Sequence, residues 1–165
     1  MLRKMLQGLG FLSLAMLAGA AIMSPAAAKI TGKCTPARID FVASDKASAT
    51  SSSSLLPVPD MFLSFTQGGN AASCIMLQFQ AQAHAPGTSA SLISLDARLD
   101  GDDTDNYFPP QPQFAANDET FGVIRSMTIV FPSVAPGQHT IRMFFRSANG
   151  GVVELSNPSL IVNHN

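Results

Sequence analysis

The feature that most constrains the fold of this chain is a repeated alternation of apolar and polar residues with a period of two. Three segments show it: Cys74–His84, Ser91–Asp100 and His139–Ser147. Successive side chains of a β-strand point to opposite faces, so this period predicts strands with one face in a core and the other toward solvent. The residues expected to face the core are Ile75, Leu77, Phe79, Ala81 and Ala83, then Ile93, Leu95, Ala97 and Leu99, and finally Ile141, Met143 and Phe145.

Shorter apolar runs predict further strands around these three. They are Arg38–Ala43, Asp60–Gln67, Ile124–Phe131 (ended by Pro132), Val152–Leu155 and Leu160–Asn163. Turn-forming residues separate the runs, and Asn149-Gly150 between two of them is the strongest β-hairpin signal in the chain. About eight short strands with tight turns and no amphipathic helix predict an all-β domain, an antiparallel β-sandwich or jelly roll.

The N-terminus has the three parts of a cleavable signal peptide. Arg3 and Lys4 are followed by the uncharged apolar stretch Leu9–Met23, and then by small residues that end at Ala28. We expect a helical signal peptide over residues 1–28, cleavage between Ala28 and Lys29, and a single domain over residues 29–165. The alternative is an uncleaved anchor, but a spanning helix needs about 20 apolar residues. The sequence therefore predicts export to the periplasm or the extracellular space, with no membrane-embedded part after cleavage.

The two cysteines, Cys34 and Cys74, both follow the predicted cleavage site. In an oxidising compartment two thiols most simply form one disulfide. A zinc site is disfavoured because two cysteines cannot supply four ligands and the histidines show no ligand spacing with them.

The charges disfavour nucleic acid as a partner. After the signal peptide, eight basic residues are scattered along the chain and eleven acidic residues outnumber them. A nucleic-acid-binding surface needs a clustered basic face, which this distribution does not predict.

Two segments interrupt the alternation and are predicted to be flexible loops, near residues 44–54 and 101–120. The first is polar and of low complexity, and the second is rich in aspartate and proline. Long loops are often functional, so the second is the first place to look for a site. Its acidic cluster offers oxygen ligands for Ca²⁺, although no glycine stands at the sixth position and no glutamate at the twelfth, as an EF-hand requires. The candidate ligands are Asp100, Asp102, Asp103 and Asp105.

No catalytic motif stands out in the sequence. No serine lies in a G-x-S-x-G turn, and neither Glu119 nor Glu154 lies in a context typical of a glycosidase. His139 lies at the start of an inward-facing pattern, where a hydrogen-bonded structural histidine is a better interpretation than a catalytic base.

One aromatic residue breaks the alternation on a polar face. Phe144 lies between Arg142 and Arg146 in a predicted strand. This stripe is a candidate interaction patch, for a partner subunit or an anionic ligand; the plainer interpretation is a ring covered by a loop. Sugar-binding platforms favour Trp and Tyr, and the chain has no Trp and one Tyr, Tyr107.

The C-terminal third carries a distinctive order of motifs: Pro136-Gly137, then His139-Thr140, Arg146-Ser147, Gly150-Gly151 and Leu160-Ile161-Val162 with His164. This pattern resembles the ending of small uncharacterised exported bacterial β-sandwich proteins. The resemblance implies a sandwich or jelly-roll fold and implies no activity.

Together these observations predict an exported, non-enzymatic β-sandwich that acts as a binding, assembly or structural module. Its partner is undefined, with a second copy or a cell-surface polymer as candidates, and no cofactor is expected apart from the Ca²⁺ considered above. The alternative is a secreted hydrolase, or a carbohydrate- or Ca²⁺-binding module, that uses residues 101–120.

Overall fold

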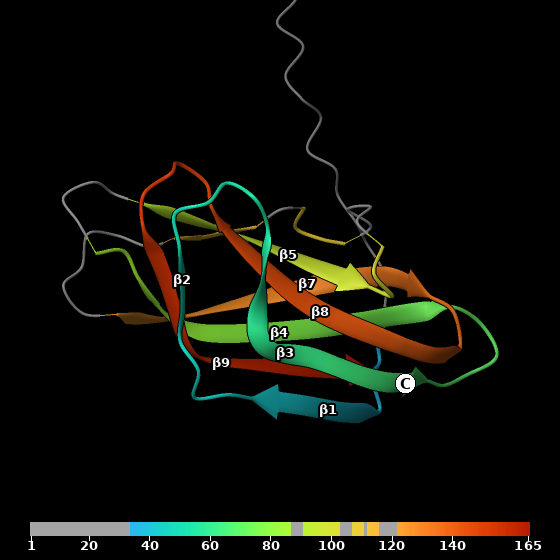
Figure 1. Ribbon diagram of the computed structural model, residues 1–165. Helices are drawn as coiled ribbons and strands as arrows, with labels where there is room; N and C mark the ends of the chain where they lie inside the picture. Colours follow the sequence, from blue (N-terminus) through green and yellow to red (C-terminus); the bar gives the residue numbers. More distant parts are fainter. Residues whose placement is uncertain (1–33, 87–90, 103–106, 111, 116–121) are drawn as a thin grey trace, which may run out of the picture. The chain divides into compact units, whose positions relative to one another are not determined.

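The computed structural model describes residues 34–86, 91–102, 107–110, 112–115 and 122–165. This part of the chain forms strands and no helix (Figure 1). The strands are β1 (Arg38–Ala43), β2 (Ser48–Thr50), β3 (Leu56–Gln67), β4 (Ser73–His84), β5 (Leu92–Leu99), β6 (Gln113–Ala115), β7 (Val123–Val134), β8 (Gly137–Ser147) and β9 (Val153–His164).

The strands form two antiparallel sheets, so the predicted all-β sandwich is confirmed. Sheet A has the order β1-β9-β4-β7, with β2 pairing to β9 beyond the end of β1. Sheet B has the order β3-β8-β5-β6. When β1 and β2 are counted as one interrupted edge strand, each sheet has four strands. The order of the strands in the two sheets is then that of a jelly roll.

The alternating apolar side chains meet between the two sheets. Phe79 from β4 and Phe145 from β8 are completely buried, as are most of the residues assigned to the core from the alternation. Ser94 and Asp96 on β5 were expected to face solvent, but both are buried. Asp96 is covered by the chain after β5, where the buried Tyr107 donates a hydrogen bond from its hydroxyl to Asp96 over 2.8 Å. Ser94 pairs with Gln113 of β6.

Three predicted strand bounds were wrong. Strand β3 begins at Leu56 and not at Asp60. The runs Val152–Leu155 and Leu160–Asn163 belong to one strand, β9, in which Asn157 has a positive φ of 50° and the pairing with β4 shifts register. Strand β7 continues past Pro132 to Val134. Proline lacks a backbone N–H, and an edge strand such as β7 tolerates it because one side of the strand has no ladder partner.

The hairpin predicted at Asn149-Gly150 was also wrong. This turn joins β8 of sheet B to β9 of sheet A, and the two strands do not pair. Gly150 does have the positive φ, 79°, that the turn signal indicates. Residue type therefore predicted the bend correctly, but not the partners of the strands around it.

The two segments predicted as loops each contain a short strand. Strand β2 lies within residues 44–54, and strand β6 lies within residues 101–120. Phe108 also bridges to Val130 of β7, and Phe114 on β6 is buried against Phe79 with ring centroids 5.6 Å apart. Residues 103–106, 111 and 116–121 lie outside the described residues.

The described strands all belong to one compact unit, Gly32–Asn165. The predicted signal peptide and its cleavage site at Ala28 and Lys29 lie outside the described residues. Among the residues that are described, no helix is long and apolar enough to cross a membrane.

Candidate functional site

The predicted disulfide is present. Cys34 and Cys74 are bonded, with their Cα atoms 5.5 Å apart. The bond joins the segment before β1 to the start of β4, on either side of β9 in sheet A. It supports the prediction of an oxidising compartment, because disulfides persist mainly outside the cytosol.

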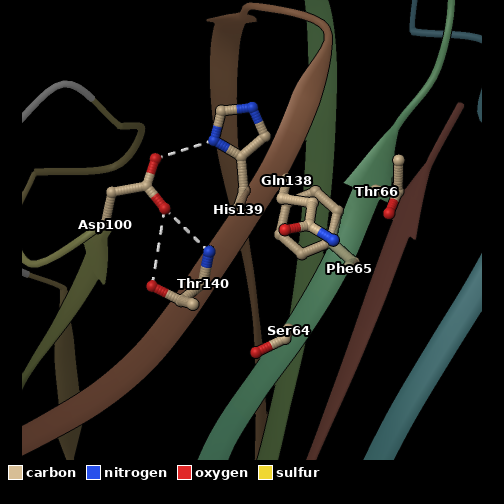
Figure 2. Close-up of a pocket in the computed structure, with 7 residues that line it drawn as sticks. All are labelled: Ser64, Phe65, Thr66, Asp100, Gln138, His139 and Thr140. Carbon is tan, nitrogen blue, oxygen red and sulfur yellow. Dashed lines mark hydrogen bonds and ion pairs between the residues drawn. The ribbon is translucent and has the colours of Figure 1, made fainter.

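At one end of the sandwich an aspartate, a histidine and a threonine form a compact group (Figure 2). Asp100, which directly follows β5, accepts a hydrogen bond from the backbone N–H of Thr140 over 2.7 Å. Its other oxygen lies 2.7 Å from His139 Nδ1. These residues border a pocket of about 300 Å³, lined also by Ser64, Phe65, Thr66 and Gln138.

The second ring nitrogen of His139 is also engaged. Nε2 lies 2.8 Å from the backbone carbonyl oxygen of Ala135. A carbonyl can only accept, so this nitrogen donates and has no free lone pair for a proton from substrate. Within the described residues no serine hydroxyl bonds to His139. His139 therefore bridges the β7–β8 turn and the chain after β5 through its two ring nitrogens, which is the structural role that the sequence favoured. This geometry does not favour hydrolysis at the pocket.

The carboxyl of Asp100 is held in its charged form. Partial burial pushes its pKa up, but the hydrogen bonds from His139 and Thr140 outweigh burial and hold the pKa below its ordinary value. Asp100 also has a positive φ of 54°, an αL conformation that aspartate adopts more readily than most residues. Its carboxylate thus has a structural role, because both oxygens are hydrogen-bonded within the protein.

A second aspartate–histidine pair lies on the other side of Phe65. His164 on β9 is only 2% exposed, and its Nε2 lies 2.8 Å from Asp40 on β1. The ring of Phe65 lies between the two histidines, with centroids 5.7 Å from His139 and 5.0 Å from His164. The two pairs close this end of the core, one in each sheet.

The calcium hypothesis gains no support from the residues that can be placed. Asp100 faces His139 and Thr140, and Asp102 is exposed in the turn after β5. Asp103 and Asp105 lie outside the described residues. Within the described ranges, no three His, Cys, Asp or Glu side chains lie close enough together to hold a metal ion.

The predicted patch at Phe144 lies on the outer face of sheet B. The ring of Phe144 is half-buried, and the guanidinium carbons of Arg98 and Arg142 lie 4.7 and 5.7 Å from its centroid. Arg146 is half-buried on the same strand. Arg98 was missed by the sequence interpretation because it comes from β5, and only the pairing of β5 with β8 places it opposite Arg142.

The outer face of sheet A has a different chemistry. Apart from Glu154 and His84, which lie 4.0 Å apart at one end, its outward side chains are uncharged. Amides and hydroxyls occupy much of the middle of the face, and exposed apolar side chains lie along the β1 edge and at Ile124 on the β7 edge. The uncharged outward residues include Ile39, Phe41 and Ala43 on β1; Ala49 on β2; Ser156, Ser159, Ile161 and Asn163 on β9; Met76, Gln78, Gln80 and Gln82 on β4; and Ile124, Ser126, Thr128 and Val130 on β7.

A hollow of about 230 Å³ lies in the middle of this face. The hollow lies between two rows of side chains that cross the strands. One row contains Gln78 of β4 and the other contains Gln80. Its lining consists of Gln78, Phe79, Gln80, Ser126, Met127, Thr128, Ser159 and Ile161. Nothing in this lining is charged. We call it the amide hollow.

Two large apolar side chains adjoin the amide hollow on β1. Phe41 is 74% exposed and pairs with Ile161, so it lies at the end of the row that contains Gln78. Ile39 is 67% exposed and lies one row further on. Solvent-exposed aromatic and aliphatic groups next to a polar hollow are typical of a ligand-binding surface.

No family model matches this sequence, and no curated protein matches it. Among solved structures, dimeric latent PorU from Porphyromonas gingivalis is similar over 80% of this chain and 13% of that chain, with 12% identity and a TM-score of 0.46. A family GH115 4-O-methyl-alpha-glucuronidase with specificity for decorated arabinogalactans is similar over 85% of this chain and 19% of that chain, with 14% identity and a TM-score of 0.39. The EclA C-terminal domain, a sugar-binding protein, is similar over 83% of this chain and 86% of that chain, with 15% identity and a TM-score of 0.35. The chain thus spans less than a fifth of the first two structures, and these distant likenesses do not bear on its ligand.

Only part of the amide hollow can be predicted from the sequence. In Cys74–His84, Gln78, Gln80 and Gln82 alternate with the apolar residues, which predicts that they point outward. The sequence does not show that the outward faces of β9 and β7 lie beside them, because those strands are far away in the chain. A search for uncharged outward faces on several predicted strands is the signal that would have found it.

Proposed function

We propose that this protein is an exported binding module and that it binds an uncharged, hydroxyl-rich polymer, such as a neutral polysaccharide, across the outer face of sheet A. The observation that carries the proposal is the amide hollow, in which the amides of Gln78 and Gln80 and three hydroxyls lie together with apolar residues of the same three strands and with no charged group. The disulfide supports the export part of the proposal.

The chemistry of the hollow suits neutral hydroxyl groups. Side-chain amides both donate and accept hydrogen bonds, and so do the hydroxyls of Ser126, Thr128 and Ser159. A sugar hydroxyl has the same dual character. An ionic ligand would instead require an opposite charge, and the lining supplies none.

The extent of the face suits a chain better than a single small molecule. Neighbouring strands lie about 4.8 Å apart, so a row of four strands spans about 14 Å. Phe41 at the end of one row offers a flat apolar surface for the C–H face of a sugar ring. A polymer crossing the strands would contact Phe41, Ile161 and Gln78 in turn.

The test is a screen of neutral polysaccharides by isothermal titration calorimetry, followed by Gln80→Ala and Phe41→Ala. We expect Gln80→Ala to weaken the best ligand about fivefold, because one hydrogen bond contributes about 1 kcal/mol. Phe41→Ala should weaken it about tenfold through loss of the apolar contact. Because the ligand is uncharged, the affinity should not change with salt.

Gln113→Ala is the matched control, since Gln113 is an exposed glutamine on β6 of the opposite sheet. It should leave the affinity unchanged. The proposal fails if no neutral polymer binds. It also fails if native mass spectrometry finds a dimer that Phe41→Ala dissociates, because the apolar edge would then be covered by a second copy.

A further inference from the structure

The outer face of sheet B carries two aromatic rings and, in one row beside them, two arginines; a third arginine, the half-buried Arg146, lies further along β8 on the same face. Phe62 on β3 pairs with Arg142 on β8, and Arg142 pairs with Arg98 on β5. Phe144 lies two residues beyond Arg142 on the same face of β8. We call these four residues the Arg142 patch. It faces away from sheet A, so it is separate from the amide hollow.

The two arginines differ in their partners. Arg98 donates from Nε to Asp96 over 3.0 Å, and Asp96 in turn holds the hydroxyl of Tyr107. Arg142 is exposed and contacts the ring of Phe144, but it makes no ion pair within the part of the chain that the structure describes. One guanidinium of the patch is therefore neutralised, and the other is open to an anion.

We propose that the Arg142 patch binds a carboxylate carried on a sugar ring, that is, a uronic-acid residue of an acidic polysaccharide. A guanidinium presents paired N–H donors that match the two oxygens of a carboxylate. Phe62, which is 51% exposed beside Arg142, supplies an apolar surface for the ring that bears the carboxylate.

The charge count favours this ligand over a more highly charged one. Among the described residues, Arg142 is the one guanidinium of the four-residue patch without an acidic partner, because Asp96 pairs with Arg98. Nucleic acids and anionic membranes are bound through several basic groups at once. A polymer with one carboxylate per ring presents separated single charges, each next to an apolar ring face. That spacing matches one open guanidinium beside one exposed phenyl ring.

The experiment titrates polygalacturonate into the full protein by calorimetry, with dextran as the uncharged polymer. We expect polygalacturonate to bind and added salt to weaken it. Arg142→Gln should lower the affinity at least about tenfold, Arg142→Lys should recover part of the loss, and Phe62→Ser should weaken binding several-fold. Thermal unfolding followed by circular dichroism checks that these surface variants fold.

Arg38→Gln is the matched control, because Arg38 is an exposed arginine on β1 of the other sheet. If Arg38→Gln weakens polygalacturonate as much as Arg142→Gln does, the attraction is unspecific and the proposal is overturned. Phosphatidylglycerol vesicles that bind where polygalacturonate does not would overturn it in favour of a membrane surface. Gln80→Ala should leave polygalacturonate binding intact. The proposal for sheet B can therefore fail or hold independently of the proposal for sheet A.

Discussion

The ring of Phe65 lies between two histidines that each pair with an aspartate. His139 reaches Asp100 and the carbonyl of Ala135, and His164 reaches Asp40. Each pair joins segments distant in the chain, so these polar groups hold the end of the sandwich together.

Asp100→Asn should destabilise the protein by about 1 kcal/mol at neutral pH, a modest value because the carboxyl is half-exposed. The folded pKa of Asp100 lies below its ordinary value of about 3.8. The stabilisation is therefore fully present above that value and is lost as the pH falls through the folded pKa. Urea unfolding across the acid range measures the difference between the two proteins.

The difference should disappear at the acid end of the range, where the wild-type carboxyl is also protonated. Asp45→Asn removes an exposed carboxylate in the segment between β1 and β2, and it should have no comparable effect. A difference between wild type and Asp100→Asn that stays constant through the acid range would contradict the role of the charge.

Among the elements, β6 shows how short a strand can be and still belong to the core. It has three residues, yet Phe114 is only 2% exposed and packs against Phe79. The alternation in the sequence is too brief there to predict a strand. The pairing with β5 and the contact across the core are what hold this segment in place.

Phe114→Ala should lower the free energy of unfolding by about 3 to 4 kcal/mol, since it removes a buried aromatic ring and leaves a cavity. Urea denaturation measures this change. Gln113→Ala, one residue earlier and exposed, should cost little. Equal, small effects of the two variants would show that β6 is not docked on the core in solution.

Strand β9 illustrates why strand lengths were harder to predict than strand positions. The sequence predicted two strands there, Val152–Leu155 and Leu160–Asn163, with Asn157 and Pro158 between them. In the sheet, β9 has partners on both sides, so the positive φ of Asn157 becomes a local irregularity in one strand. The surrounding ladders outweigh a local turn preference.

The molecule as a whole has two outer faces of different chemistry. Sheet A presents amides, hydroxyls and the exposed Phe41, whereas sheet B presents Arg142 beside Phe62. A sandwich with these two faces can engage a neutral and an acidic polymer at once, which our two proposals predict as independent binding events.

Replacing both Cys34 and Cys74 by Ser should lower the stability of the fold by about 4 kcal/mol, because the bond closes a loop of 40 residues in the unfolded chain. Chemical denaturation of the double variant beside the oxidised protein measures this cost. Reducing agent should destabilise the wild type similarly and leave the double variant unchanged. Equal stability of the oxidised and reduced wild type would contradict the prediction.

The period-two alternation was sufficient for the all-β class, for most strand positions and for most core residues. This information is local, because the face on which a side chain lies depends only on its position along the strand. The cysteine count and the N-terminal pattern were likewise sufficient for the disulfide prediction.

Strand pairing and the candidate sites were decided only by the tertiary structure. Every strand offers the same backbone hydrogen bonds and a similar apolar face, so the sequence does not say that β9 lies beside β4 or that β8 lies beside β5. The amide hollow collects residues from β4, β7 and β9, and the Arg142 patch collects residues from β3, β5 and β8. Such surfaces come into being when distant strands become neighbours, because no local pattern records which outward faces will adjoin.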